Sequence, residues 1–266
     1  MRLTRSRLLS VLALCELSIA AGEPAQIHWP GTEWPAAAPD EVGMDATMLA
    51  EARDYAMSSG GSGLIVRHGS VVMRWGDQRQ TYDLKSSTKA IGITALGLAL
   101  MDGKFTSLHD PATRYHPALG VPPESNRDKG WLDRVTLFHL ATQTAGFDKP
   151  GGYTQLLFEP GTKWSYSDGG PNWLAECLTL VYGRDLEELM FERVFTPIGI
   201  RRDDLRWRAN AYRPHELNGF ARREFGSGIF ANVEAMARIG YLYLRRGEWN
   251  GTSIIPPWFV DAARTV

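Results

Sequence analysis

The chain has 266 residues and a formal net charge of −1 at pH 7, and 44% of its residues are hydrophobic. This size suffices for a large folded domain with its own core, and the near-neutral charge gives no electrostatic basis for binding nucleic acid or an anionic membrane. Because there are only two cysteines and no HExxH or similar histidine spacing, the sequence argues against a disulfide framework and a zinc site. We therefore expect no metal and no cofactor.

The first 22 residues have the layout of a secretory signal. Basic residues lie at positions 2, 5 and 7, an apolar stretch follows over 8–21, and small residues end it at Ala20, Ala21 and Gly22. Glu16 interrupts the stretch, so a frayed N-terminal helix is the alternative. We expect residues 1–22 to direct export to the periplasm or the exterior, and residues 23–43 to form an extended lead-in. No later segment approaches the roughly 20 apolar residues of a membrane span, so we expect none in the mature chain.

The next segments predict a helix followed by a β-hairpin. Residues 45–59 place apolar side chains at helical spacing and end at two glycines, whereas residues 63–76 form two β-rich runs around His68-Gly69-Ser70. A lone hairpin is marginally stable, so other elements must complete its sheet.

The remainder of the chain predicts mainly helices. Residues 90–101 are apolar nearly all round, which is typical of a buried central helix, and Gly92 and Gly97 allow close packing against it. Further helices are expected over 136–143, 171–182, 185–195 and 233–246. Asn232 is a suitable N-cap for the last of these.

Ser86 and Lys89 stand at the start of the predicted central helix, in the sequence KSSTKAIG. Their spacing of three places both side chains on one helix face, which Ser87 does not share. A serine becomes nucleophilic when a nearby base takes its proton, and a buried lysine can serve where arginine cannot. The bland alternative is a polar helix start with a solvated lysine, because Ser-x-x-Lys is a weak motif by itself.

Residues 159–170, EPGTKWSYSDGG, form a turn-rich loop between two predicted helices. Tyr166 of this loop could hydrogen-bond Ser86 and act as a general base or proton shuttle, as could Ser167. In isolation, a tyrosine that packs its ring on the surface is the simpler interpretation.

Four blocks in this order resemble the class C β-lactamase-like serine hydrolases, a group that includes penicillin-binding proteins, D-Ala-D-Ala carboxypeptidases and esterases. They are YDLKSSTKAIG, VTLFHLATQTAGF, FEPGTKWSYSDGG and GSGIFANVEAMARIGYLYLRRG. The resemblance covers roughly residues 40–266. It implies an α/β (α+β) fold of the β-lactamase/transpeptidase type, in which a hairpin of an antiparallel sheet is flanked by helices and an all-helical region is inserted. We expect a single domain over 44–266.

By this resemblance Ser86 is the acylated nucleophile and an oxyanion donor through its N–H, Lys89 is its activating partner, and Tyr166 is the tyrosine of the family's Tyr-x-Asn motif. Here Asp168 replaces the asparagine. A carboxylate at this substrate-binding position favours the ammonium form of Lys89, moves proton transfer toward Tyr166, and repels a substrate carboxylate.

The family's third motif, Lys/His-Thr/Ser-Gly on a late strand, does not occur in the sequence. That strand normally supplies the second oxyanion donor. We therefore expect a chain truncated at its C-terminal end, with the late strands missing and an unpaired sheet edge beside Ser86.

The resemblance predicts a serine hydrolase that acts through an acyl-enzyme on a small ester, amide or peptide. Esterase or peptidase activity is favoured over efficient β-lactam hydrolysis because of Asp168. The alternative is a non-catalytic module of the same fold that binds a ligand or a partner.

Overall fold

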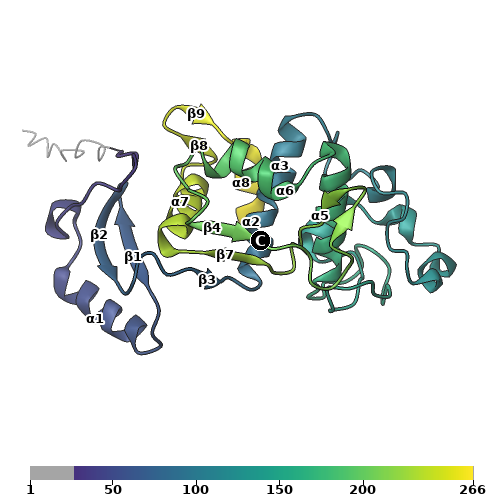
Figure 1. The fold of residues 1–266 in the computed structure, drawn as a ribbon, viewed down its shortest axis with the longest axis horizontal. Coiled ribbons are helices and arrows are strands. Elements are labelled where there is room, and N and C mark those ends of the chain that lie inside the picture. Colours follow the sequence, from purple (N-terminus) through teal and green to yellow (C-terminus); the bar gives the residue numbers. More distant parts are fainter. Residues whose placement is uncertain (1–26, 266) are drawn as a thin grey trace, which may run out of the picture.

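The computed structural model describes residues 27–265 (Figure 1). Its α-helices are α1 Ala46–Met57, α2 Ser87–Gly92, α3 Thr94–Met101, α4 Leu137–Thr142, α5 Gly169–Tyr182, α6 Leu186–Met190, α7 Val233–Leu244 and α8 Pro257–Arg264. Its strands are β1 Gly63–Arg67, β2 Ser70–Trp75, β3 Tyr82–Asp83, β4 Leu205–Trp207, β5 Glu216–Leu217, β6 Phe220–Ala221, β7 Ile229–Ala231, β8 Glu248–Trp249 and β9 Thr252–Ser253. The expected signal segment, residues 1–22, lies outside the described residues.

The N-terminal part consists of α1 and the hairpin β1–β2, as the sequence predicts (Figure 1). The side chain of Asp45 caps α1 by accepting a hydrogen bond from the backbone of Met48 at 2.9 Å. His68 and Gly69 both have positive φ, which a two-residue turn between twisted strands requires.

Strand β1 pairs only with β2 within residues 27–265, and α7 packs against the hairpin. One edge of β1 therefore has no partner strand in this part of the chain, and the expected place of such an edge beside Ser86 stays a prediction. The missing second oxyanion donor and the truncation stay predictions.

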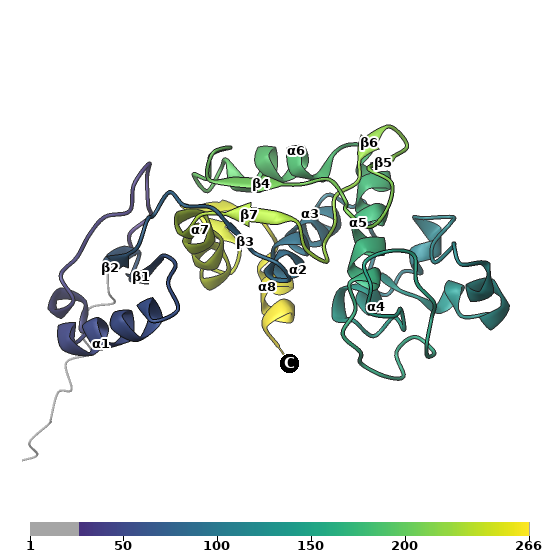
Figure 2. The same cartoon turned by 60° about the horizontal axis from the view of Figure 1, so that its bottom comes forward.

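A second antiparallel sheet has the strand order β3–β7–β4. Tyr82 of β3 and Leu205 of β4 both face Ala231 of the central strand. Figure 2 shows this sheet with α6 above it and α7 and α8 below it. The pairing places the segment just before Ser86 against the segment that leads into β7. This mixture of small antiparallel sheets and helices confirms the predicted fold class.

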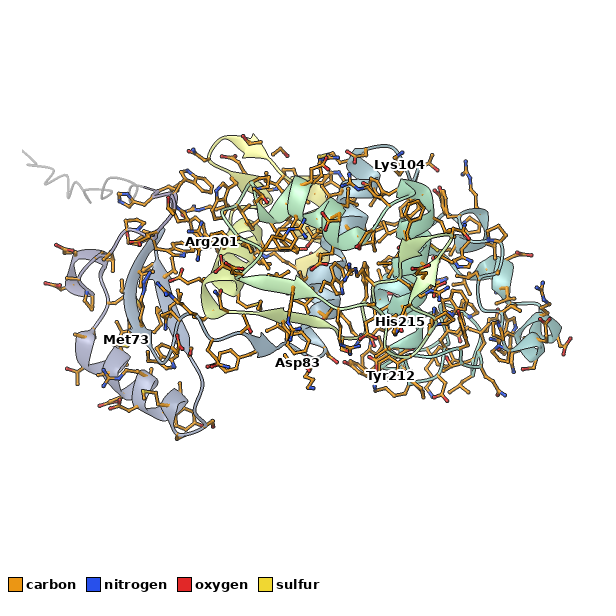
Figure 3. The ribbon with its side chains drawn as sticks, viewed as in Figure 1. Met73, Asp83, Lys104, Arg201, Tyr212 and His215 are labelled. Atoms are coloured by element: carbon orange, nitrogen blue, oxygen red, sulfur yellow. The ribbon has the colours of Figure 1, made fainter. Side chains whose placement is uncertain are left out.

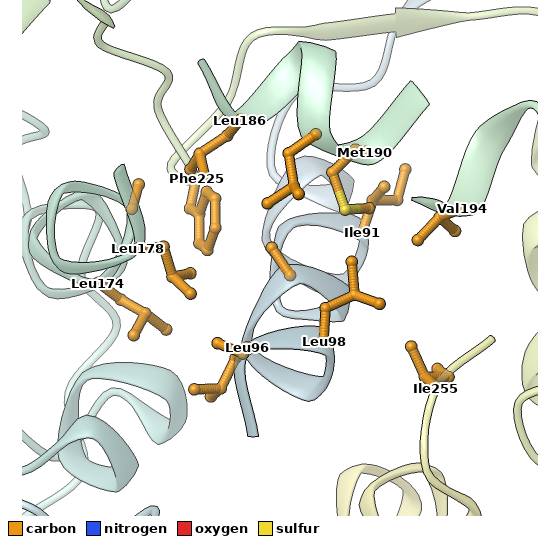
Figure 4. Close-up of a cluster of buried hydrophobic side chains, with 14 of the residues drawn as sticks. Ile91, Leu96, Leu98, Leu174, Leu178, Leu186, Met190, Val194, Phe225 and Ile255 are labelled. Atoms are coloured by element: carbon orange, nitrogen blue, oxygen red, sulfur yellow. The ribbon is translucent and has the colours of Figure 1, made fainter. Parts of the chain in front are cut away.

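The predicted central helix over 90–101 is two helices, α2 and α3, which meet at Ile93. The pair is buried, and the predicted role of the two glycines is confirmed. A Cβ on Gly92 would lie 2.8 Å from the Phe225 ring, and one on Gly97 would lie 2.8 Å from the Phe259 ring. Figure 4 shows α2 and α3 within a cluster of apolar side chains that α5, α6 and the C-terminal region also supply.

The other predicted helices are present with shifted ends. The predicted helix 185–195 is α6 followed by a π-helical turn over Phe191–Phe195, and α7 ends at Leu244, before the left-handed Arg246. Asn232 caps α7 as predicted, with its side chain accepting from Ala235. Between α3 and α5 the described chain has only α4 and three short 3-10 helices (Ala112–Arg114, Glu124–Lys129 and Leu132–Arg134). The expected all-helical region is thus less regular than the resemblance implies, because prolines and glycines interrupt it.

None of the helices in residues 27–265 combines the length and the apolar character that a membrane crossing requires.

A buried ion network lies along α5. Glu176 is 1% exposed, and its two oxygens contact His116 at 3.0 Å and Arg213 at 2.6 Å. Arg222 lies 3.3 Å from the same carboxylate. Burial opposes ionisation of Glu176, but the hydrogen bond with His116 and the charge of Arg213 outweigh burial and lower its pKa. The network therefore ties α5 to two distant loops through a charged carboxylate.

Replacing Glu176 by Gln should destabilise the fold strongly, because Arg213 is left buried without its counter-charge. We expect a loss of about 3–5 kcal/mol in the free energy of unfolding, measured by urea denaturation. Glu192→Gln is the matched control, since Glu192 pairs with Arg184 at the surface and its loss should cost at most about 1 kcal/mol. Equal, small effects of the two substitutions would contradict a stabilising role of the network.

Candidate active site

Ser86 precedes the first turn of α2 and is exposed to solvent. Lys85, the residue before it, has a φ of 49°, a left-handed conformation that costs a non-glycine residue about 1 kcal/mol. Asp83 holds this conformation by accepting hydrogen bonds from the Lys85 backbone at 3.0 Å and from its ammonium group at 2.5 Å. Within residues 27–265 the Ser86 N–H has no acceptor, so this donor is available to a ligand. The sharp turn thus presents the hydroxyl and the N–H of one residue together.

Lys89 projects from the next turn of α2 toward Ser86. Its Nζ donates to Ser86 Oγ at 3.2 Å, to the Gly226 carbonyl at 2.8 Å and to Asp168 Oδ1. The Lys89 side chain is 11% exposed. Three acceptors match the three N–H donors of an ammonium group. The arrangement therefore suits a charged Lys89 that stabilises negative charge at Ser86.

Tyr166 brings a phenol to the same place from the loop before α5. Lys89 Nζ lies 4.8 Å from the centroid of its ring. Burial favours the neutral phenol, but hydrogen bonds with Ser86 and Lys89, together with the charge of Lys89, outweigh burial and lower the pKa of Tyr166. A phenol with a lowered pKa next to a serine hydroxyl is suited to accept its proton.

Asp168 bridges two lysines. Its Oδ1 accepts from Lys89, and its Oδ2 accepts from Lys149 at 2.5 Å. The hydrogen bond with Asp168 is the main reason that the pKa of Lys149 is raised. The expectation that Asp168 repels a substrate carboxylate considered Lys89 beside it but not Lys149. With both lysines charged, these three groups together carry one positive charge.

Asn172 and Arg213 hold together the three loops that supply the site. Asn172 accepts from the backbone N–H groups of Phe225 and Gly226, each at 2.9 Å, and donates to the Gly151 carbonyl at 2.8 Å. Arg213 donates to the Gly169 carbonyl, next to Asp168, at 3.2 Å. A buried amide and a buried guanidinium thereby fix the positions from which Gly226 and Asp168 reach Lys89 and from which Lys149 reaches Asp168.

The structure brings Ser86, Lys89, Tyr166 and Asp168 together, as the motifs indicate. Ser167 does not join them, because its hydroxyl donates to the Asp148 carbonyl at 2.9 Å and accepts from Gly170 at 3.1 Å. Sequence reasoning missed the parts played by Lys149, Asp83, Asn172 and the Gly226 carbonyl. The scarcity of lysine, with six in the chain, was the available signal for Lys149.

A cluster of three acidic residues lies away from this group, at the start of α6. Asp185 and Glu187 both contact Arg223, and Glu188 pairs with Arg202. Arginine thus already neutralises the carboxylates that could otherwise attract a cation.

The sequence profile of the β-lactamase family matches residues 49–258. An uncharacterised protein of Alkalihalophilus pseudofirmus is 23% identical over 220 residues, which are 74% of this chain and 62% of that protein. The lovastatin esterase of Penicillium rubens is 31% identical over 93 residues, 32% of this chain and 23% of the esterase. The chain thus spans less than two thirds of the length of these curated relatives.

A solved structure from Bacillus anthracis, provisionally named 6-aminohexanoate-dimer hydrolase, superimposes with a TM-score of 0.65 at 16% identity. The match covers 91% of this chain and 69% of that one. At such low identity the likeness shows the fold alone. Together with the profile match, which extends over most of the chain, it establishes that this protein belongs to the β-lactamase family of serine hydrolases.

Proposed function

We propose that this protein hydrolyses carboxylic esters or amides through an acyl-enzyme on Ser86. The observation that carries the proposal is the convergence of three groups: Lys89 Nζ lies 3.2 Å from Ser86 Oγ and 4.8 Å from the centroid of the Tyr166 ring. A nucleophile, a proton acceptor and a cation in contact are what acyl transfer requires.

In the proposed mechanism the phenolate form of Tyr166 takes the proton of Ser86 as Oγ attacks the carbonyl carbon. The developing oxyanion is stabilised by the Ser86 N–H, and the charge of Lys89 stabilises the ionised phenol. Collapse of the tetrahedral intermediate breaks the bond to the leaving group, which takes the proton from Tyr166. Water then attacks the acyl-enzyme and gives its proton to Tyr166. Tyr166 passes this proton to Ser86 Oγ as the acyl group leaves, which regenerates Ser86.

Lys89 is assigned an electrostatic role because its environment suits the ammonium form. A lysine that accepts the serine proton must present a lone pair, whereas the Gly226 carbonyl and the Asp168 carboxylate can only accept hydrogen bonds from Lys89. Tyr166, whose pKa is lowered, is the better proton acceptor in this environment.

An ester is favoured as the substrate. The supporting observation is the 31% identity over 93 residues to a protein named lovastatin esterase. Because this stretch covers only 32% of the chain, the preference concerns the type of bond cleaved and not a particular molecule.

Incubation with a fluorophosphonate should add one phosphonyl group per chain, because an activated serine displaces fluoride from phosphorus. Intact-protein mass spectrometry measures the adduct, and release of nitrophenol from a nitrophenyl ester measures turnover. Heat-denatured protein is the control for non-specific labelling. Reversible ester binding without an adduct or turnover would instead identify a non-catalytic binding module.

A further inference from the structure

Lys149 stands outside the Ser86–Lys89–Tyr166 group but shares a carboxylate with it. Asp168 has one oxygen on Lys89 and the other on Lys149, and its backbone N–H also donates to the Lys149 carbonyl at 2.9 Å. The two residues are thus joined through both backbone and side chain, although 19 positions separate them in the sequence. Such a double link fixes where the Lys149 charge lies.

The three charged groups differ in exposure. The side chains of Lys89 and Asp168 are 11% and 17% exposed, whereas that of Lys149 is 56% exposed. An ion pair on so exposed a lysine contributes at most about 1 kcal/mol to folding, so stability alone does not account for the arrangement. Lys149 Nζ lies 5.3 Å from the centroid of the Tyr166 ring, on which the proposed proton transfer depends.

We propose that Lys149 is a positioning residue for proton transfer at Ser86, and that it acts by sharing the charge of Asp168. Without Lys149, the full negative charge of Asp168 would act on Lys89 and Tyr166. That charge favours the protonated phenol of Tyr166, so less of the phenolate that accepts the serine proton is present near neutral pH. Lys149 in this way compensates for an aspartate at the position where the Tyr-x-Asn motif, which the 166–168 segment resembles, has a neutral asparagine. This inference rests on the proposed function.

Charged and titratable groups among the described residues act on Tyr166 and on the Lys149–Asp168 pair. Lys89 faces Tyr166 from α2, and Asp168 faces it from the start of α5. Tyr212 faces Lys149, and Glu224 faces Asp168. Figure 3 shows Tyr212 and Asp83 at the lower edge of the molecule and Lys104, which lies beyond the end of α3, at the upper edge. Lys104 is therefore a suitable control for the loss of one positive charge.

The test follows the titration of Tyr166 by NMR of protein carrying ¹³C-labelled tyrosine, with the signal assigned through Tyr166→Phe. In Lys149→Met the midpoint should rise by about 1 pH unit, and in Asp168→Asn it should fall by a similar amount. Because Lys149 acts through Asp168, adding Lys149→Met to the Asp168→Asn variant should shift the Tyr166 midpoint by less than half of the shift that Lys149→Met causes in the parent protein. Lys149→Arg and Lys104→Met should titrate like the parent protein.

The pH profile of kcat/KM for a nitrophenyl ester is the second readout. Activity that needs a deprotonated base appears above the pKa of that base, so Lys149→Met should move the acidic limb to higher pH. Unchanged Tyr166 midpoints in Lys149→Met, or equal shifts with and without Asp168, would overturn the role of Lys149. The expected NMR shifts in a protein that neither hydrolyses esters nor reacts with fluorophosphonate would overturn the proposed function alone.

Discussion

Ser86→Ala should abolish phosphonyl labelling and lower ester turnover by at least about 10³-fold. The reason is chemical: alanine has no oxygen to form the acyl-enzyme, and within residues 27–265 no other serine or threonine hydroxyl hydrogen-bonds the Lys89 amine. Labelling measured by intact mass and turnover measured by nitrophenol release should fall together. The fold should be unaffected, because the Ser86 side chain is exposed and makes no capping hydrogen bond.

Ser87→Ala is the matched control for this substitution. Ser87 is the neighbouring serine and is also exposed, but it lies on another side of α2 and does not contact Lys89. Labelling and turnover should remain within a few-fold of the parent protein. The reverse result, with Ser87→Ala silent and Ser86→Ala active, would move the nucleophile to Ser87.

Local features of the fold could be predicted from the sequence because the signals that determine them are local. Asp45 and Asn232 cap helices through hydrogen bonds that span three residues, and His68-Gly69 sets a turn within its own hairpin. The division of the central helix at Ile93 could not be predicted this way. Ile93 keeps helical dihedral angles there, and nothing in the apolar pattern on either side distinguishes two helices from one.

The residues of the site also divide into those that local spacing predicts and those that it does not. Ser86 and Lys89 are neighbours on one helix turn, so their spacing predicts contact. Tyr166 and Asp168 were placed with them through the resemblance to a known family and not through spacing. Lys149 reaches the site only because Asn172 and Arg213 tie its loop to two others, and such contacts over 21 and 61 residues leave no periodic pattern in the sequence.

The order of the three strands in the β3–β7–β4 sheet has a related cause. β3 and β7 pair across nearly 150 positions, and that pairing holds the turn before Ser86 against the segment that presents the Gly226 carbonyl. Strands of two or three residues carry too little alternation for a period of two to be recognised. The alignment of Ser86 with Gly226 therefore follows from the fold and could not be predicted from either segment alone.

Tyr166→Phe should lower kcat by about 10²–10⁴-fold while KM changes little, because the substitution removes the proton acceptor and leaves the ring in place. The lowered pKa of Tyr166 makes its phenol a better acceptor near neutral pH than an ordinary tyrosine. If Tyr166 is the base, turnover in the parent protein should rise as the pH increases through this pKa, and Tyr166→Phe should lose that rise. Steady-state kinetics with a nitrophenyl ester between about pH 5 and pH 10 measure both effects.

Tyr212→Phe is the control, since Tyr212 is an exposed tyrosine near Lys149 that is not among the groups shifting the pKa of Tyr166. It should keep both the rate and the pH profile.

The kinetics of Tyr166→Phe also distinguish Tyr166 from Lys89 as the group that accepts the serine proton. If Lys89 were the base, Tyr166→Phe would keep a pH-dependent rate whose midpoint belongs to the amine. A flat, low rate is expected instead, because Lys89 donates to the Asp168 carboxylate and the Gly226 carbonyl, and an ammonium group has no lone pair to offer.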